Sequence, residues 1–119
     1  AKAWSIWEAS TSKLIPTKKA LHSFDSEDIA EAFARIECHY FINNAFFEND
    51  NWILENVDKI KNIPTHIVQG RYDVVCPAKS AWDLHQALPN SNFHLIQDAG
   101  HSMLEKGIQK KLIQITDTI

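Results

Sequence analysis

Apolar residues recur at helical spacing through the first half of the chain. The spacing predicts a short helix over about 2–10, a longer one over about 26–43 and a third over about 51–60. At 100° per residue, the longer helix gathers its apolar side chains on one arc, a face suited to burial. The positions on this arc are Ile29, Phe33, Ile36 and Tyr40.

Short apolar segments replace the helical pattern after Pro64. Strands are predicted over 65–69 and 93–96, and each is followed by an amphipathic helix. The two helices span about 77–88 and about 107–118. A strand–helix–strand–helix order of this length predicts a right-handed crossover between two parallel, neighbouring strands.

These patterns divide the chain into two parts and predict an α/β fold. We expect a helical segment over 1–62 and two βα units over 63–119. The chain has 119 residues, with 12 Lys and Arg against 15 Asp and Glu, so its formal net charge is −3. Such a charge offers no basic surface for nucleic acid or anionic lipid, and no apolar run is long enough to span a membrane.

Cysteine and glycine usage narrows the classes of function. Cys38 and Cys76 make no disulfide framework, which favours reduced thiols and a cytoplasmic location. With only 3 glycines, the chain holds no G-x-S-x-G elbow, P-loop or G-x-G-x-x-G turn. It therefore carries no elbow-type nucleophile of its own. Because it also starts at Ala1 without a methionine, we expect it to be a piece of a longer protein.

One acidic and one basic residue follow the two predicted strands. Asp73 comes after the first strand and His101 after the second, 28 residues later. The carboxyl ends of neighbouring parallel strands meet at one edge of a sheet, which is where ligands bind in open α/β sheets. A carboxylate that orients an imidazole base is what acyl transfer requires. The same residues would also suit a turn-capping Asp and an exposed loop histidine, and the pattern alone leaves both interpretations open.

Glu37 is the one charged residue inside the apolar arc of the long helix, between Phe33 and Phe41. A carboxylate there loses hydration and stays charged only if a cation or hydrogen-bond donors compensate. That partner is either a cationic substrate group or a fixed Arg or Lys of the parent protein. Glu8 lies beside Trp4 and Trp7, which we expect to pack in the core.

The remaining reactive side chains point to no further chemistry. The six histidines lack metal-ligand spacing, so no metal site and no cofactor are expected. His66 and His94 lie in strands, where we expect satisfied core or edge residues. Cys76 is expected to be a small buried residue.

Five motifs in order along the chain resemble the carboxyl-terminal part of the proline iminopeptidase family. In the second half, Gly-Arg-Tyr-Asp-Val-Val-Cys-Pro (70–77), Ala-Trp-Asp-Leu-His (81–85) and Ala-Gly-His-Ser (99–102) carry the resemblance. In the first half, Ala-Trp-Ser-Ile-Trp-Glu (3–8) and Phe-Ala-Arg-Ile-Glu-Cys-His-Tyr-Phe (33–41) resemble the helical cap of the family. Position 38 is Cys where the family has Asn, a change that should not disturb its neighbour Glu37.

The resemblance implies an α/β hydrolase that releases amino-terminal proline from peptides by serine acyl transfer, without a cofactor. It implies that Asp73 is the acid and His101 the base of a catalytic triad. It also implies that Glu8 and Glu37 receive the charged imino terminus of the substrate. The amino-terminal half with the nucleophilic serine would be a missing partner, so this chain alone is expected to be inactive and to self-associate. The alternatives are another α/β hydrolase, such as an esterase, and a non-catalytic interaction module.

Overall fold

The computed structural model describes residues 1–16 and 27–118, with the side chain of Glu27 excluded. Its first part contains α1 (Lys2–Thr11) and α3 (Glu27–Ile42). Short helical turns follow along the chain, and then come the two strands of the sheet with the helices that follow them. These elements are η1 (Asn44–Phe46), α4 (Trp52–Glu55), η2 (Val57–Lys59), β1 (Thr65–Gly70), α5 (Ala78–Ala87), β2 (Ser91–Ile96) and α6 (Lys106–Thr116).

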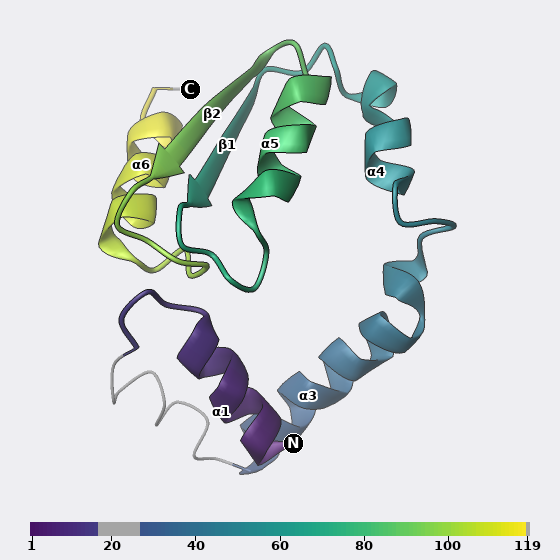
Figure 1. Cartoon of the computed structure of the whole chain (residues 1–119), viewed down its shortest axis with the longest axis vertical. Helices are drawn as coiled ribbons and strands as arrows, with labels where there is room; N and C mark the ends of the chain where they lie inside the picture. The colour runs from purple at the N-terminus through teal and green to yellow at the C-terminus, as the bar shows by residue number, and fades with distance from the viewer. Residues whose placement is uncertain (17–26, 119) are drawn as a thin grey trace.

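β1 and β2 pair in parallel, as the strand–helix–strand pattern predicts. Thr65 lies opposite Ser91 and Gly70 opposite Ile96, so both strands end at the same edge. Figure 1 shows α5 on one face of this sheet and α6 on the other. The observed helices and parallel strand pair confirm the expected mixed α/β class.

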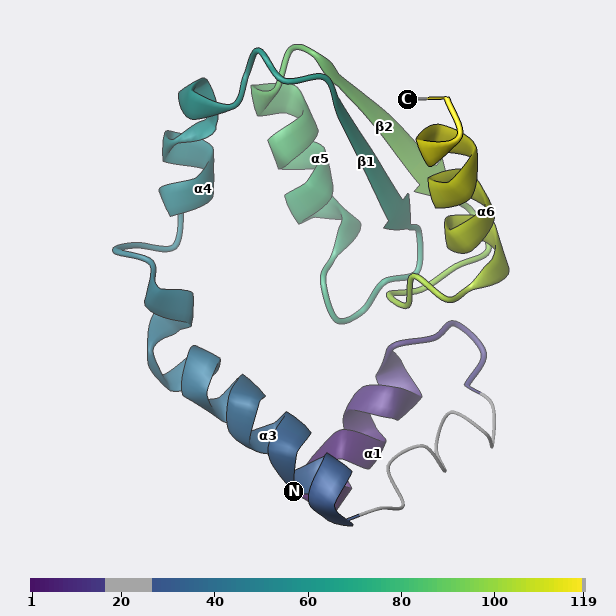
Figure 2. The ribbon, with the colours of Figure 1, turned by 180° about the vertical axis from the view of Figure 1, so that it is seen from behind.

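α1 and α3 cross beyond the carboxyl ends of the strands, where the loops that follow β1 and β2 face the end of α1 (Figures 1 and 2). Small residues allow the close crossing: Ser5 and Ala30 are both 0% exposed, and the Ser5 hydroxyl donates to the Ala30 carbonyl at 3.2 Å. The helical part therefore closes over the edge of the sheet that carries the candidate residues.

The long helix forms where it was predicted, but its buried face is different. Ile29, Ile36 and Tyr40 are exposed, whereas Ala30 lies against α1. Periodicity identifies which residues are apolar, and it does not identify the surface that covers them. Ser26, the first residue of the predicted helix, lies outside the described residues.

The prediction of one continuous helix over 51–60 is wrong. α4 ends at Glu55, Asn56 has non-helical backbone angles, and a separate 3₁₀ turn follows. The Asn56 side-chain amide donates to the Trp52 carbonyl at 2.7 Å. Asparagine competes in this way for backbone partners and so favours helix ends over helix interiors.

The division of the chain between residues 62 and 63, into a helical segment and two βα units, stays a prediction. Up to Lys59 the described residues form only helices and turns, and the first strand begins at Thr65. None of the helices in residues 1–16 and 27–118 has the length and apolar content that a membrane crossing requires.

Candidate functional site

Asp73 is held in one orientation by the loop that follows β1. Its Oδ1 accepts hydrogen bonds from the backbone N–H groups of Val75 at 3.0 Å and Cys76 at 2.8 Å. Its Oδ2 accepts from the side-chain amide of Gln69 at 3.1 Å. The Asp73 side chain is only 5% exposed. A nearly buried carboxylate is stabilised when donors surround it in this way.

His101 completes this arrangement from the loop after β2. Its Nδ1 lies 3.0 Å from Asp73 Oδ2, while its side chain is 40% exposed. Because an ionised carboxylate only accepts hydrogen bonds, Nδ1 carries the proton of the neutral imidazole. Nε2 is then the nitrogen that can take up and return a proton. The two residues whose spacing predicts proximity are therefore in hydrogen-bond contact.

Glu37 receives a hydrogen bond that its sequence context does not reveal. The indole Nε1 of Trp4 donates to Glu37 Oε2 at 2.6 Å. Trp4 also packs against Trp7 at 5.3 Å and edge-on to Phe41 at 6.4 Å between ring centres. Glu37 therefore lies beside a cluster of aromatic rings. The neutral indole of Trp4 provides a hydrogen-bond donor but does not neutralise the negative charge of the carboxylate.

Glu8 lies close enough to Glu37 and His101 for their charges to affect its pKa. Partial burial raises the pKa of Glu8 above its ordinary value of 4.5; the Glu37 carboxylate raises this pKa further, and His101 opposes the shift. None of the ion pairs among the described residues involves Glu8 or Glu37. Two neighbouring carboxylates in this state form a favourable site for a cation.

The thiol of Cys76 adjoins the same cluster. Partial burial and the negative charges of Asp73 and Glu8 raise the pKa of the Cys76 thiol. A thiol with a raised pKa stays protonated and is a poor nucleophile. The structure thus brings together all four predicted site residues, namely Glu8, Glu37, Asp73 and His101, through direct contacts or through their charges.

Two expectations about neighbouring residues are corrected. Trp4 and Trp7 are 41% and 54% exposed, so they are not core residues of the described structure, in which α1 packs against α3. Cys76 is exposed and not a small core residue, since it lies in the loop beyond the sheet. His66 and His94 do satisfy each other, with their ring nitrogens 3.1 Å apart.

Sequence reasoning missed Gln69 and Glu105. Gln69 is the polar residue at the end of β1, four positions before Asp73. Its position at the carboxyl edge of the sheet is the feature from which a role at the site could have been predicted. Glu105 accepts hydrogen bonds from two backbone N–H groups, one of them 91 residues away. No local pattern reveals such a long-range contact.

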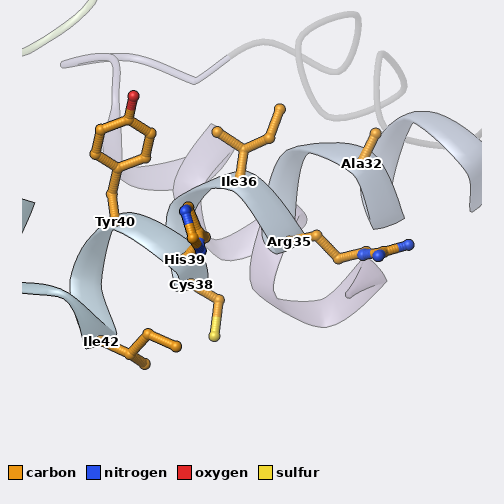
Figure 3. Close-up of a pocket in the computed structure, with 7 residues that line it drawn as sticks. All are labelled: Ala32, Arg35, Ile36, Cys38, His39, Tyr40 and Ile42. Atoms are coloured by element: carbon orange, nitrogen blue, oxygen red, sulfur yellow. The ribbon is translucent and has the colours of Figure 1, made fainter.

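One open hollow adjoins this cluster at His101 and Ser102, whereas another lies apart from it. In the part of the chain that the structure describes, no group of three or more His, Cys, Asp or Glu residues is placed to hold a metal ion. An open hollow on the surface of α3 is shown in Figure 3. All its lining residues belong to that helix, and none is a candidate site residue. They are Ala32, Arg35, Ile36, Cys38, His39, Tyr40 and Ile42.

Comparison with known proteins gives a consistent set of relatives. No protein-family profile matches the chain. It is 59% identical over 117 residues to a probable proline iminopeptidase of Leptolyngbya boryana, covering 98% of this chain and 36% of that protein. It is 50% identical over 113 residues to the proline iminopeptidase of Arabidopsis thaliana, covering 95% and 30% respectively. The Neisseria gonorrhoeae proline iminopeptidase is 39% identical over 120 residues, covering 100% and 37%.

The chain thus spans about a third of the length of the curated relatives that it matches. The matched third is their carboxyl-terminal part. This placement agrees with a fold that consists of two βα units and a helical segment. Over nearly its whole length, the chain corresponds to the carboxyl-terminal portion of the proline iminopeptidases, which are α/β hydrolases.

Proposed function

We propose that this chain supplies the acid, the base and the amine-binding carboxylates of a serine aminopeptidase that releases amino-terminal proline from peptides. The observation that carries the proposal is the Asp73–His101 hydrogen bond, 3.0 Å long, beside the carboxylates of Glu8 and Glu37. The names and coverage of the relatives support the reaction and a longer parent enzyme.

The proposed mechanism is acyl transfer. His101 Nε2 takes the proton of a serine hydroxyl supplied by the rest of the enzyme, and the serine oxygen attacks the prolyl carbonyl carbon. The tetrahedral intermediate collapses as the C–N bond breaks, and the imidazolium returns the proton to the leaving amine. His101 then activates a water molecule that hydrolyses the prolyl ester. Asp73 keeps the proton on Nδ1 and stabilises the imidazolium.

Glu8 and Glu37 act on the other end of the substrate. An amino-terminal proline carries a secondary ammonium group, which can compensate both carboxylates at once. The Trp4 indole orients Glu37 and adds an apolar surface for the pyrrolidine ring. Binding the ammonium group places the prolyl carbonyl at a fixed distance from the base, which reduces the entropic cost of reaction.

The test is Glu37→Gln in the complete enzyme that contains this chain. The amide keeps the size of the side chain and an acceptor for Trp4, and it removes the negative charge. We expect kcat/KM for proline-4-nitroanilide to fall by about 10²-fold, because the charge pair between Glu37 and the substrate ammonium group loses one partner. A neutral 4-nitrophenyl ester, which has no amine, should be hydrolysed as well as before.

Three results would contradict the proposal. An unchanged rate with proline-4-nitroanilide would show that Glu37 is not an amine anchor. A parent enzyme that hydrolyses the ester but not proline-4-nitroanilide would favour the esterase alternative. Equal losses on both substrates would assign Glu37 to folding.

A further inference from the structure

The segment that follows α1 is fastened to the loop that carries His101. The carbonyl of Ser12 accepts the backbone N–H groups of His101 at 3.1 Å and Ser102 at 2.6 Å. The carboxylate of Glu105 bridges the same two segments: its Oε2 accepts from the Leu14 N–H at 3.2 Å and its Oε1 from the Gly100 N–H at 2.7 Å. We call this set of hydrogen bonds the Glu105 clasp.

The clasp closes over a tight backbone contact. Gly100 is buried, and a Cβ atom at this position would lie 2.9 Å from the backbone nitrogen of Leu14. Glu105 itself is half-buried. A carboxylate that accepts two backbone N–H groups forms charge-assisted hydrogen bonds, which are shorter and stronger than neutral ones. The Glu105 side chain thus holds the two segments close together, in addition to the hydrogen bonds of the Ser12 carbonyl.

The two fastened segments carry the two halves of the proposed site. Glu8 lies on α1, one turn before Ser12, and His101 lies between Gly100 and Ser102. We propose that Glu105 is a positioning residue that sets the distance between the amine anchor and the base, and thereby the selectivity for substrates with a free amino terminus. This inference rests on the proposed function, since it concerns the spacing of that same site.

The consequence is specific to substrates that engage both halves. A proline substrate contacts the carboxylates with its ammonium group and presents its carbonyl to the base. A misplacement of about 1 Å between the halves can cost such a substrate up to ~10²-fold in rate. A neutral ester meets only the half that contains His101, so loosening the clasp should affect it less.

The experiment uses Glu105→Gln in the complete enzyme. The new amide retains one acceptor but turns an N–H donor toward a backbone N–H donor, so one hydrogen bond is lost. Glu48→Gln is the matched control, because it makes the same chemical change at an exposed residue outside the clasp. Glu105→Asp keeps the charge but is too short to span both N–H groups, and it provides a milder second variant.

Two quantities are measured on each variant. The first is the ratio of kcat/KM for proline-4-nitroanilide to kcat/KM for a neutral 4-nitrophenyl ester. The second is the hydrogen–deuterium exchange of the Leu14 and Gly100 amides. We expect Glu105→Gln to lower the ratio by about 10-fold and to speed exchange at both amides. Glu105→Asp should give an intermediate ratio, and Glu48→Gln should change neither quantity.

Each other outcome counts against the clasp. Faster exchange with an unchanged ratio would show that the clasp does not affect selectivity. Equal losses on both substrates would reduce Glu105 to a folding role, and unchanged exchange would show that it does not hold these amides. Failure of the proposed function is recognised separately, because the unmodified enzyme would then release no nitroaniline from proline-4-nitroanilide.

Discussion

Both oxygens of the Asp73 carboxylate accept hydrogen bonds from neighbouring groups. Two backbone N–H groups hold Oδ1, while Gln69 and His101 share Oδ2. A donor on the oxygen that faces the imidazole withdraws negative charge from that contact. Gln69 therefore tunes how strongly Asp73 stabilises the imidazolium of His101.

Replacing Gln69 by Met tests this tuning. Met has a similar volume and no N–H donor, so Asp73 Oδ2 interacts with His101 alone and favours the imidazolium more strongly. We expect a several-fold loss in kcat, because the carboxylate no longer has the donor that helps to orient it toward His101. Gln86→Met, on the exposed side of α5, is the control. An unchanged kcat would contradict the role of Gln69.

Glu8 should make cation binding dependent on pH. Its pKa is raised above 4.5 by partial burial and by Glu37, and a bound cation favours the ionised form. Proton uptake by Glu8 as the pH falls through this raised pKa should therefore weaken inhibition by pyrrolidine, a cation without a scissile bond. In Glu8→Gln, this acid-side weakening should be smaller, because the neutral amide takes up no proton in this range. The inhibition constants of the two enzymes between pH 4 and 7 decide the matter, and identical pH dependences would exclude Glu8.

Sequence alone predicts part of this site, for a physical reason. Asp73 and His101 follow neighbouring parallel strands, so topology brings their loops together whatever else the chain does. The contacts of Trp4 with Glu37 and of Glu105 with Leu14 depend on how α1 crosses α3 and returns to the sheet. No local periodicity encodes that crossing.

At the scale of whole elements, close backbone approach positions the site. The end of β1 meets the His101 loop at Gly70, where a Cβ atom would lie only 1.8 Å from the carbonyl oxygen of Gly100. The longer helices were predictable from their periodicity, whereas the break at Asn56 and the buried face of α3 were not. Ala30 and Ser5 form the α1–α3 contact, and the larger apolar residues of α3 remain exposed.

Gly70→Ala should therefore separate the loops that carry Asp73 and His101. The methyl group meets rigid backbone and the strand end must shift, which we expect to cost about 1–3 kcal/mol in the free energy of unfolding of the complete enzyme. Gly107→Ala is the matched control. Its Cβ would lie 2.5 Å from the Cγ2 methyl of Ile96 and 3.1 Å from Oδ1 of Asp98, so side chains and not backbone would have to shift, and Ala favours the helix by ~1 kcal/mol. Denaturant unfolding curves of both variants measure the difference, and equal stabilities would contradict the close approach at Gly70.

The whole molecule is expanded for its length. Its radius of gyration is 16.1 Å, against about 13–14 Å for a compact domain of this size. The buried hydrophobic residues of the described chain are few, and Leu88 and Ile108 are the largest of them. A sheet of two strands also leaves both outer edges unpaired. These surfaces favour association with further protein.

The isolated 119-residue chain should therefore self-associate and hydrolyse no proline-4-nitroanilide. Its apolar surface drives association. We propose that the nucleophilic serine belongs to the rest of the enzyme, and without it the imidazole and carboxylates of this chain cannot carry out acyl transfer. Sedimentation velocity measures the first property and nitroaniline release the second. A single monomer boundary with cooperative thermal unfolding would contradict the first expectation. Turnover proportional to the concentration of the chain would contradict the second.

The most direct test of the central claim is the activity of three histidine variants of the complete enzyme. kcat/KM for proline-4-nitroanilide is measured for His101→Ala, His85→Ala and His94→Ala. Of these three histidines, His101 contacts Asp73, the proposed acid, whereas His85 contacts Ser91 and His94 contacts His66. We predict a loss of at least ~10³-fold for His101→Ala and largely retained activity for the other two. Substantial activity in His101→Ala, or equal losses in all three variants, would contradict the assignment of His101 as the base.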